Sequence, residues 1–318
     1  MRVAVVDLGT NSTRLLVADV QDGQVKEVAR DTRITRLGEG VDTRRRLLPV
    51  PVARVRNVLT EYRRETDALG AERVLAIGTS AVRDADNGEA FLGELEWSYG
   101  FTTRLLRGEE EALLTFRGVT LDRALSGATL VVDIGGGSTE LILGAAGEVE
   151  WRESLDIGSV RLTERFLHSD PPASSELDDC VAAVRALLAD QVPSRVDPEA
   201  AIGVAGTITT LAALDLGLEE YDSERVHGHR MAAAAVGSLL DRLAALPLAE
   251  RRRVPALDPE RAPVIVAGAV ILREILSHFG LDAIETSEHD LLHGAALEAA
   301  ELPAPTEGAA PPGAYTCC

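Results

Sequence analysis

Short apolar, β-branched runs alternate along the chain with longer amphipathic stretches, and this pattern predicts strands separated by helices. Two of the apolar runs, residues 3–6 and 130–132, each end at an aspartate and continue through small residues into a second apolar run. Each therefore predicts a strand, a tight turn and a second strand. One further strand is predicted at residues 281–286, and helices are predicted at residues 51–69, 174–188, 262–279 and 288–301. Strands that alternate with helices predict a largely parallel α/β core.

An internal repeat relates the two halves of the chain. Residues 7–17 align with residues 133–143, with Asp, Gly, Ser, Thr and Leu at the same places. A second pair follows in the same order, since residues 74–79 resemble residues 202–207. Two matched pairs predict a duplicated α/β unit, and we expect two such cores that face each other across a cleft.

The repeat also predicts the domain boundaries. We expect a first domain at residues 1–121, a second at residues 122–287, and a last helix at residues 288–302 that packs back on the first domain. Residues 303–318 contain four prolines with Gly and Ala and few core-forming residues, a composition that predicts a disordered tail.

Composition and charge narrow the class of protein. The chain has 318 residues, of which 46% are hydrophobic and 26% charged, as in soluble globular proteins. A net charge of −19 argues against a nucleic-acid partner. Asp7 ends the first apolar run, and no stretch approaches the roughly 20 apolar residues of a membrane span, so we expect no signal peptide and no membrane contact. Three cysteines make no disulfide framework, and we expect a cytoplasmic protein.

The two small-residue turns are candidate phosphate sites. A Gly-rich turn after a strand brings backbone N–H groups together and forms an anion-binding nest. The alternative is a plain hairpin turn, but two equivalent turns, each led by an acid, favour phosphate binding. Two hydroxyl-rich segments, Gly78-Thr79-Ser80 and Gly206-Thr207, are predicted to be turns of the same kind. The residues of the two nests are Gly9, Thr10, Asn11 and Ser12, and Gly135, Gly136, Gly137 and Ser138.

Acidic residues supply the candidate catalytic and metal-binding groups. Asp133 and Glu140 lie at opposite ends of the second hairpin, where their carboxylates can share Mg²⁺. The alternative, an Asp that caps its own turn and an exposed Glu on a strand, remains open from spacing alone. The run Glu109-Glu110-Glu111 begins a predicted helix, where acids complement the helix dipole, and spacing does not single out one of the three as a catalytic base.

With these motifs the chain resembles the exopolyphosphatase and guanosine pentaphosphate phosphatase family of the actin-like ATPase superfamily. The motifs run in family order over residues 1 to about 300. They are Asp7 to Ser12, Arg36-Leu37-Gly38-Glu39-Gly40-Val41, Thr79 to Asp84, Gly108 to Ala112, Asp133 to Glu140, Gly206 to Leu211 and Val226-His227-Gly228.

The resemblance implies a fold and a role for each motif. The fold is two duplicated actin-like, ribonuclease H-like domains. Glu111 is the catalytic base, and Asp133 and Glu140 hold Mg²⁺, with Mn²⁺ as a possible substitute. Gly135 and its neighbours bind phosphate, and Arg83 binds a second phosphate.

The resemblance also implies the activity. We expect an exopolyphosphatase that releases orthophosphate processively from inorganic polyphosphate by in-line attack of water. The alternative is a phosphohydrolase that acts on the 5′ end of guanosine pentaphosphate, and more distant alternatives are an actin-like kinase and a non-catalytic polyphosphate sensor. The chain ends before the C-terminal helical domains of long members, so we expect the short two-domain form, as a homodimer.

Two features of the chain stand apart from the shared motifs. Residues 291–294 read Leu-Leu-His-Gly where the family usually has Leu-Arg-Glu-Gly. The run Arg44-Arg45-Arg46 lies in a polar segment that we interpret as a solvated turn, with guidance of the substrate tail as the alternative.

Overall fold

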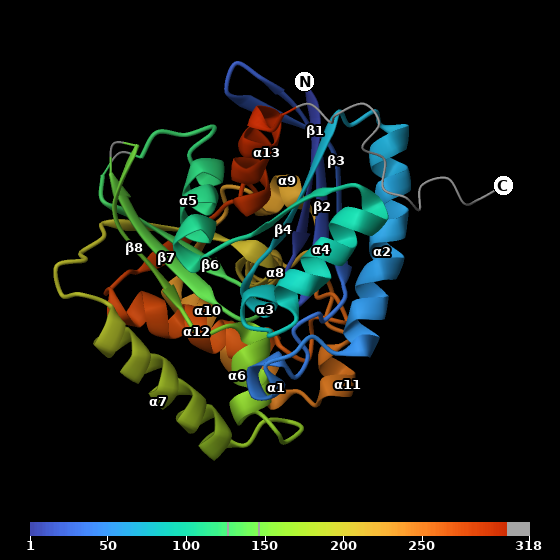
Figure 1. Ribbon diagram of the computed structural model, residues 1–318. Helices are drawn as coiled ribbons and strands as arrows, with labels where there is room; N and C mark the ends of the chain where they lie inside the picture. Colours follow the sequence, from blue (N-terminus) through green and yellow to red (C-terminus); the bar gives the residue numbers. More distant parts are fainter. Residues whose placement is uncertain (126, 146, 304–318) are drawn as a thin grey trace. The chain divides into compact units, whose positions relative to one another are not determined.

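The computed structural model describes residues 1–125, 127–145 and 147–303. The chain forms two compact units (Figure 1). The first unit comprises Met1–Leu121 with the chain from Leu291 onward, and the second comprises Asp122–Asp290. The tail predicted at residues 303–318 lies, apart from Pro303, outside the described residues. No helix in the described ranges has both the length and the apolar character needed to cross a membrane.

The first unit is a five-stranded sheet in the order β3-β2-β1-β4-β5 with helices on both faces. Its strands are β1 (Arg2–Leu8), β2 (Ser12–Gln21), β3 (Gln24–Ile34), β4 (Arg73–Gly78) and β5 (Thr102–Leu105). Its helices are α1 (Val41–Arg44), α2 (Pro49–Ala68), α3 (Ser80–Arg83), α4 (Gly88–Tyr99), α5 (Gly108–Val119) and α13 (Leu291–Glu301).

The apolar side chains of β1 point alternately to the two faces of the sheet, which explains why helices cover both faces. Ala4 and Val6 point into a core formed with α2 and α4. Val3 and Val5 point the other way, into a core formed with α5 and α13, which pack against each other. Successive side chains of a strand point to opposite faces, so a continuously apolar strand requires a layer on each side.

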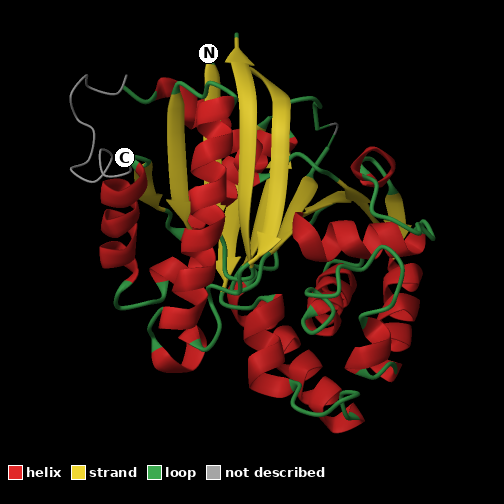
Figure 2. Cartoon of the chain, turned by 90° about the vertical axis from the view of Figure 1, so that its right-hand side faces the viewer, coloured by secondary structure: helices red, strands yellow, loops and turns green. Residues whose placement is uncertain are grey.

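The second unit is a six-stranded sheet in the order β10-β11-β9-β6-β7-β8. Its strands are β6 (Thr129–Ile134), β7 (Thr139–Ala145), β8 (Glu148–Leu155), β9 (Ala200–Val204), β10 (Arg230–Ala232) and β11 (Ala283–Thr286). Its helices are α6 (Ser159–Phe166), α7 (Ser174–Gln191), α8 (Ala205–Asp215), α9 (Ser223–Val226), α10 (Ala233–Ala245), α11 (Leu248–Arg251) and α12 (Ile265–His278). Figure 2 shows strands in yellow and helices in red.

The two sheets repeat one topology, which confirms the predicted duplication. The order β3-β2-β1-β4-β5 in the first unit corresponds to β8-β7-β6-β9-β11 in the second, where β10 adds an edge strand. The predicted hairpins are β1–β2 and β6–β7, both antiparallel, and they have the same register, with Asp7 paired with Arg14 and Asp133 with Glu140. The helix that follows β5 is α5, and the helix that follows β11 is α13, which also packs in the first unit.

The last helix begins later than the predicted residue 288. The Ser287 hydroxyl accepts a hydrogen bond from the His289 amide at 3.1 Å and donates one to the His289 carbonyl at 3.0 Å. Such local side-chain bonds compete with helical hydrogen bonding, so the helix starts at Leu291. The boundary between the two units accordingly lies after Asp290 rather than after Ser287.

Candidate active-site residues in the two units

The second hairpin places two acids directly opposite each other. Asp133 on β6 pairs with Glu140 on β7, and both are buried, with 6% and 1% of their surface exposed. The Ser154 hydroxyl donates to Glu140 Oε1 at 2.8 Å. Directly paired residues of antiparallel strands lie on one face of the sheet, close enough for their side chains to interact.

The equivalent positions of the first hairpin hold a different pair of residues. There Asp7 pairs with Arg14, and the guanidinium binds the Asp7 carboxylate with Nη2 2.8 Å from Oδ2. The repeat thus has an acid–arginine ion pair in the first copy and two carboxylates in the second. Mg²⁺ takes one or two protein carboxylates and completes its shell with waters or phosphate oxygens, so the second pair suits this ion. The described residues hold no larger His, Cys, Asp or Glu cluster suited to a metal.

The turn between β6 and β7 has the form of a nest, a run of converging backbone amides, and it is held from behind. The Gly135 amide donates to the Ser138 carbonyl at 3.0 Å and closes the turn. Backbone amides at the start of α6 donate hydrogen bonds to the carbonyls of the turn. The Ser159 amide donates to the Gly135 carbonyl at 3.0 Å, and the Val160 amide donates to the Gly136 carbonyl at 2.9 Å. In a trans peptide the N–H points opposite to the C=O, so the amides of the turn point away from α6. Converging amides of this kind bind anions.

Two residues that the sequence analysis missed build this nest. Gly158, just before α6, lies so close that a Cβ there would be 2.4 Å from the Gly136 carbonyl carbon and oxygen, so only glycine fits. Arg161 is 7% exposed, and its Nε donates to Gly137 O at 2.6 Å. The Gly-Ser pair that follows a strand was the available signal.

The turn between β1 and β2 is built in the same way. The Gly9 amide donates to the Ser12 carbonyl at 3.0 Å, as in the second hairpin. The Gly38 amide binds the Thr10 carbonyl at 2.8 Å, and the Arg36 amide binds the Asn11 carbonyl at 2.8 Å. The family motif that begins at Arg36 therefore supports this nest from behind, as the start of α6 supports the other.

Asn11 adds a second sign of ligand binding. Its side chain is buried, and within the described part of the chain neither Oδ1 nor Nδ2 has a hydrogen-bond partner. Leaving buried polar atoms unsatisfied costs about 1–3 kcal/mol. A polar group of a ligand, or a water, beside the nest would satisfy this amide.

The segments predicted to be hydroxyl-rich turns are helix starts, so this part of the prediction is wrong. Gly206 and Thr207 lie in the first turn of α8, and Ser80 begins α3. Thr207 is 2% exposed and packs against Gly268 of α12, where a Cβ would be 2.5 Å from the Thr207 methyl carbon. Tertiary packing of the threonine side chains therefore accompanies helix formation in this segment.

The start of α8 still suits an anion. Its N-cap, Val204, has no side chain able to bond the first helical amides, and Ala205 adopts a left-handed φ of 66°. Arg261 covers Gly206 so closely that a Cβ would lie 2.3 Å from the Arg261 Nη1. Val204 pairs with Asp133 across β9 and β6, which places this helix start beside the carboxylate pair. Helix amides together with a guanidinium bind phosphate, and Arg261 is a further residue that the sequence analysis missed.

In the first unit Glu111 and Arg83 form an ion pair. Arg83 Nη1 lies 3.1 Å from Glu111 Oε2 and donates to the Leu106 carbonyl at 2.9 Å. Glu111 is 7% exposed, in the first turn of α5. The Leu106 amide in turn bonds Gly78 O at 2.9 Å, so the pair lies at the carboxyl ends of β4 and β5. Ligand sites of α/β sheets lie at this edge.

The structure separates the three acids that the sequence left equivalent. Glu109 is exposed. The Glu110 carboxylate accepts one hydrogen bond from the Arg107 amide and one from Arg104 Nη2, each 2.8 Å long. These hydrogen bonds hold the pKa of the Glu110 carboxyl below its usual value. Glu110 therefore caps the helix, whereas the buried Glu111 meets Arg83.

The separation predicts a stability effect for Glu110 without a catalytic one. We expect Glu110→Ala to lower the free energy of unfolding by about 0.5–2 kcal/mol, the range for a lost cap, and to leave kcat nearly unchanged. Because folding lowers the pKa of Glu110, its stabilising effect is present at neutral pH and lost as the pH falls through the folded value. Urea denaturation of the parent and of Glu110→Ala at pH 7 and pH 3 measures the loss of unfolding free energy and its dependence on pH. Equal destabilisation at the two pH values would contradict the assignment.

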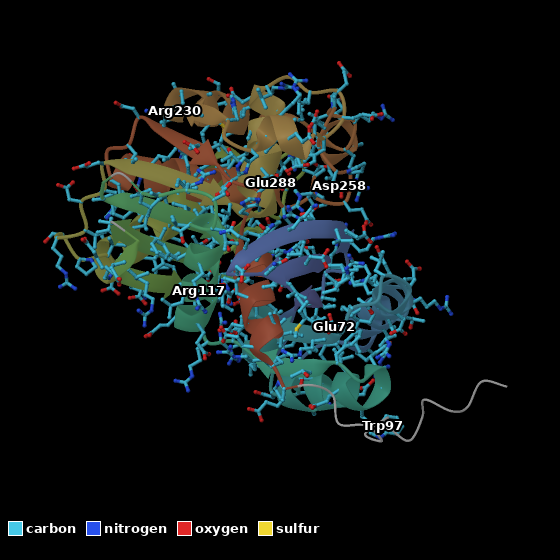
Figure 3. All side chains as sticks on the ribbon, turned by 90° about the horizontal axis from the view of Figure 1, so that it is seen from above. Glu72, Trp97, Arg117, Arg230, Asp258 and Glu288 are labelled. Atoms are coloured by element: carbon cyan, nitrogen blue, oxygen red, sulfur yellow. The ribbon has the colours of Figure 1, made fainter. Side chains whose placement is uncertain are left out.

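The predicted site residues thus form two groups, one in each unit. Asp133, Glu140, the Gly135–Ser138 nest, Gly206 and Thr207 lie at the carboxyl ends of β6 and β9. Arg83, Glu111 and the first nest lie at the corresponding edge of the other sheet. Figure 3 shows the side chains, with Arg230 and Glu288 labelled in the second unit and Glu72 and Trp97 in the first.

Two copies of one α/β topology, each with a Gly-rich turn between its first two strands, define a duplicated α/β protein. The chain belongs to the Ppx/GppA phosphatase family, enzymes that hydrolyse phosphoric anhydride bonds, and the family model matches residues 16–302.

Relatives and solved structures support this membership. The chain is 41% identical to exopolyphosphatase 2 of Mycobacterium tuberculosis, over 94% of this chain and 98% of that protein. It is 29% identical to a guanosine-5′-triphosphate,3′-diphosphate pyrophosphatase of Vibrio atlanticus, over 93% of this chain and 58% of that protein. The crystal structure of the Aquifex aeolicus family member is similar with a TM-score of 0.78 and 33% identity, over 94% of this chain and 97% of that one.

Proposed function

We propose that this protein is an exopolyphosphatase that releases orthophosphate processively from the end of inorganic polyphosphate by Mg²⁺-dependent attack of water. The observation that carries the proposal is the nest at Gly135–Ser138 beside the carboxylates of Asp133 and Glu140. At this edge of the sheet the nest can bind a phosphate group, and the two carboxylates beside it can bind the cation that accompanies the phosphate. Similarity to a mycobacterial protein named exopolyphosphatase 2 supports the choice of substrate.

In the proposed mechanism Glu111 takes a proton from the attacking water. The water oxygen forms a bond to the terminal phosphorus, and the bridging P–O bond on the opposite side breaks. The electron pair of that bond stays on the shortened chain, which leaves as an anion. Proton removal in the transition state by a positioned carboxylate accelerates such steps by about 10²–10⁴-fold.

The remaining residues bind and neutralise the phosphoryl oxygens. In this proposal the amides of the Gly135–Ser138 nest and Arg261 would donate hydrogen bonds to phosphate in the second unit. In the first unit the other nest and Arg83 would do the same, and Asn11 would supply a buried amide group. Asp133 and Glu140 would hold Mg²⁺, or Mn²⁺ in its place, which when bound supplies positive charge to the phosphate oxygens. Phosphoryl transfer depends mainly on such positioning and electrostatic stabilisation.

A second candidate substrate is guanosine pentaphosphate, which also ends in a phosphoanhydride. The likeness to the Vibrio pyrophosphatase, over nearly the whole of this chain, favours keeping this candidate. The test is phosphate release from long polyphosphate and from guanosine pentaphosphate, compared as kcat/KM. We expect the larger value for polyphosphate, and a larger value for the nucleotide would replace the proposal with this second candidate.

A further inference from the structure

A buried guanidinium of the second unit binds backbone carbonyls instead of a carboxylate. Arg251 ends α11 and is 3% exposed. Among the residues that the structure describes, it has no carboxylate partner. Burial lowers the pKa of its guanidinium, a direction that reflects the cost of holding this charge away from water. A buried charge without a counter-ion is costly, so its presence needs a reason.

One part of the reason lies at the end of α10. Arg251 Nε donates to the Leu243 carbonyl at 2.9 Å, and Nη2 donates to the Leu246 carbonyl at 2.8 Å. The helical donor for the Leu243 carbonyl would be the amide of residue 247, four positions on. Residue 247 is a proline and has no N–H. Arg251 therefore satisfies carbonyls that the helix leaves open.

The third hydrogen bond reaches the residue next to Arg261. Arg251 Nη1 donates to the Ala262 carbonyl at 3.3 Å. The intervening chain is folded by its own turns, since the Val254 amide donates to the Arg251 carbonyl at 3.2 Å. The Asp258 carbonyl accepts the Arg261 amide at 2.9 Å and the Ala262 amide at 3.1 Å, and Asp258 is labelled in Figure 3. Arg251 thus joins the two ends of this loop.

Arg261 is the group of the candidate phosphate site that this contact can move. A Cβ at Gly206 would lie within 2.4 Å of its Nη1, Cζ and Nη2, so the guanidinium lies directly against the start of α8. Ala262 is fully buried. Consecutive Cα atoms are about 3.8 Å apart, so a shift of Ala262 carries the Arg261 backbone with it.

We propose that Arg251 is a positioning residue for Arg261, whose guanidinium it keeps over the start of α8 by holding the Ala262 carbonyl. The inference rests on the proposed function and deepens it, because it adds an arginine that acts on the phosphate site without touching the substrate. The planar fork of arginine suits this role, since its N–H groups can bind several carbonyls at fixed angles. The alternative is that Arg251 serves only the end of α10, which would change stability and leave phosphate affinity unchanged.

Orthophosphate, which the proposed reaction does not consume, tests the inference without turnover. Its Kd is measured by calorimetry with Mg²⁺ present, and the melting temperature of each variant reports stability. We expect Arg261→Ala to raise the Kd by roughly 10- to 100-fold, the range for losing a charge-assisted hydrogen bond. Arg251→Met should raise it by about 3- to 30-fold, because part of that hydrogen bond is lost.

The double variant separates positioning from stability. When Arg261 is already Ala, Arg251→Met should raise the Kd by less than about 2-fold, because the group that Arg251 positions is gone. The melting temperature should fall by a similar amount in both backgrounds, since the bonds to the end of α10 are lost in each. Loss of phosphate affinity that depends on Arg261 is a result that a purely structural role does not give.

Two further variants control the measurement. Arg252→Met is the matched control, because Arg252 is the exposed next residue, and its Kd should stay within about 2-fold of the parent value. Arg251→Lys keeps the charge without the planar fork and should give a smaller loss than Arg251→Met. If Arg251→Met does not fold, Arg251→Lys takes its place in the double-variant comparison.

The possible outcomes are distinct. Equal losses of phosphate affinity from Arg251→Met with and without Arg261, or an unchanged Kd in a variant that melts earlier, would overturn the inference. A parent protein that does not bind orthophosphate would overturn it as well. If the parent binds orthophosphate with the expected dependence on both arginines but releases no phosphate from polyphosphate, the positioning role stands and the proposed function is wrong.

Discussion

Glu111→Gln is expected to lower kcat by about 10²–10⁴-fold, the range for losing a general base, while KM changes little. The amide keeps the size of the side chain and its place beside Arg83, but it cannot accept the proton of the attacking water. Phosphate release under saturating polyphosphate measures kcat, and the substrate dependence separates it from KM.

Glu109→Gln is the matched control, because the exposed Glu109 lies in the same helical turn. It should retain most of the parent kcat. If Glu109→Gln and Glu111→Gln fall equally, the acids serve the helix terminus and the assignment of Glu111 as the base is wrong.

Asp133→Asn is expected to raise the Mg²⁺ concentration for half-maximal activity by about 10-fold or more, since one carboxylate ligand is lost while size is kept. A readout without turnover accompanies it. Mg²⁺ should raise the melting temperature of the parent, because an ion that binds only the folded chain stabilises it. The same addition should have little effect on Asp133→Asn.

A substitution in the second hairpin can copy the ion pair of the first, which tests the metal site more strictly. Glu140→Arg copies the Asp7–Arg14 pair onto Asp133 and residue 140. We expect this variant to fold, to lose activity, and to show no melting shift with Mg²⁺. A parent-like Mg²⁺ shift in both Asp133→Asn and Glu140→Arg would remove the pair from the metal site.

Much of the fold follows from local sequence pattern. The apolar run at residues 3–6, followed by a Gly-rich turn, predicts the first hairpin. The same pattern around residue 133 predicts the second hairpin. The shared topology of the two sheets follows from that repeat. Such features are local because strand periodicity and turn residues act within a few positions.

Other parts depend on contacts between distant residues. The position of Arg261 against Gly206 joins residues 55 positions apart in sequence, and no local pattern announces it. The segment after Val204 reads as a turn but folds as α8, in which Thr207 packs against Gly268 of the distant helix α12. Glu110 and Glu111 are chemically equivalent in sequence, and only the placement of Arg104 and Arg83 separates a cap from a candidate base.

The proposed reaction requires that water attacks the terminal phosphorus of polyphosphate. Turnover in ¹⁸O-labelled water with Mg²⁺, followed by mass spectrometry of the products, tests it directly. We expect one labelled oxygen in each released orthophosphate, none in the shortened chain, and almost no release by Glu111→Gln. Label in the shortened chain, or phosphate found on an added acceptor instead of in solution, would contradict it.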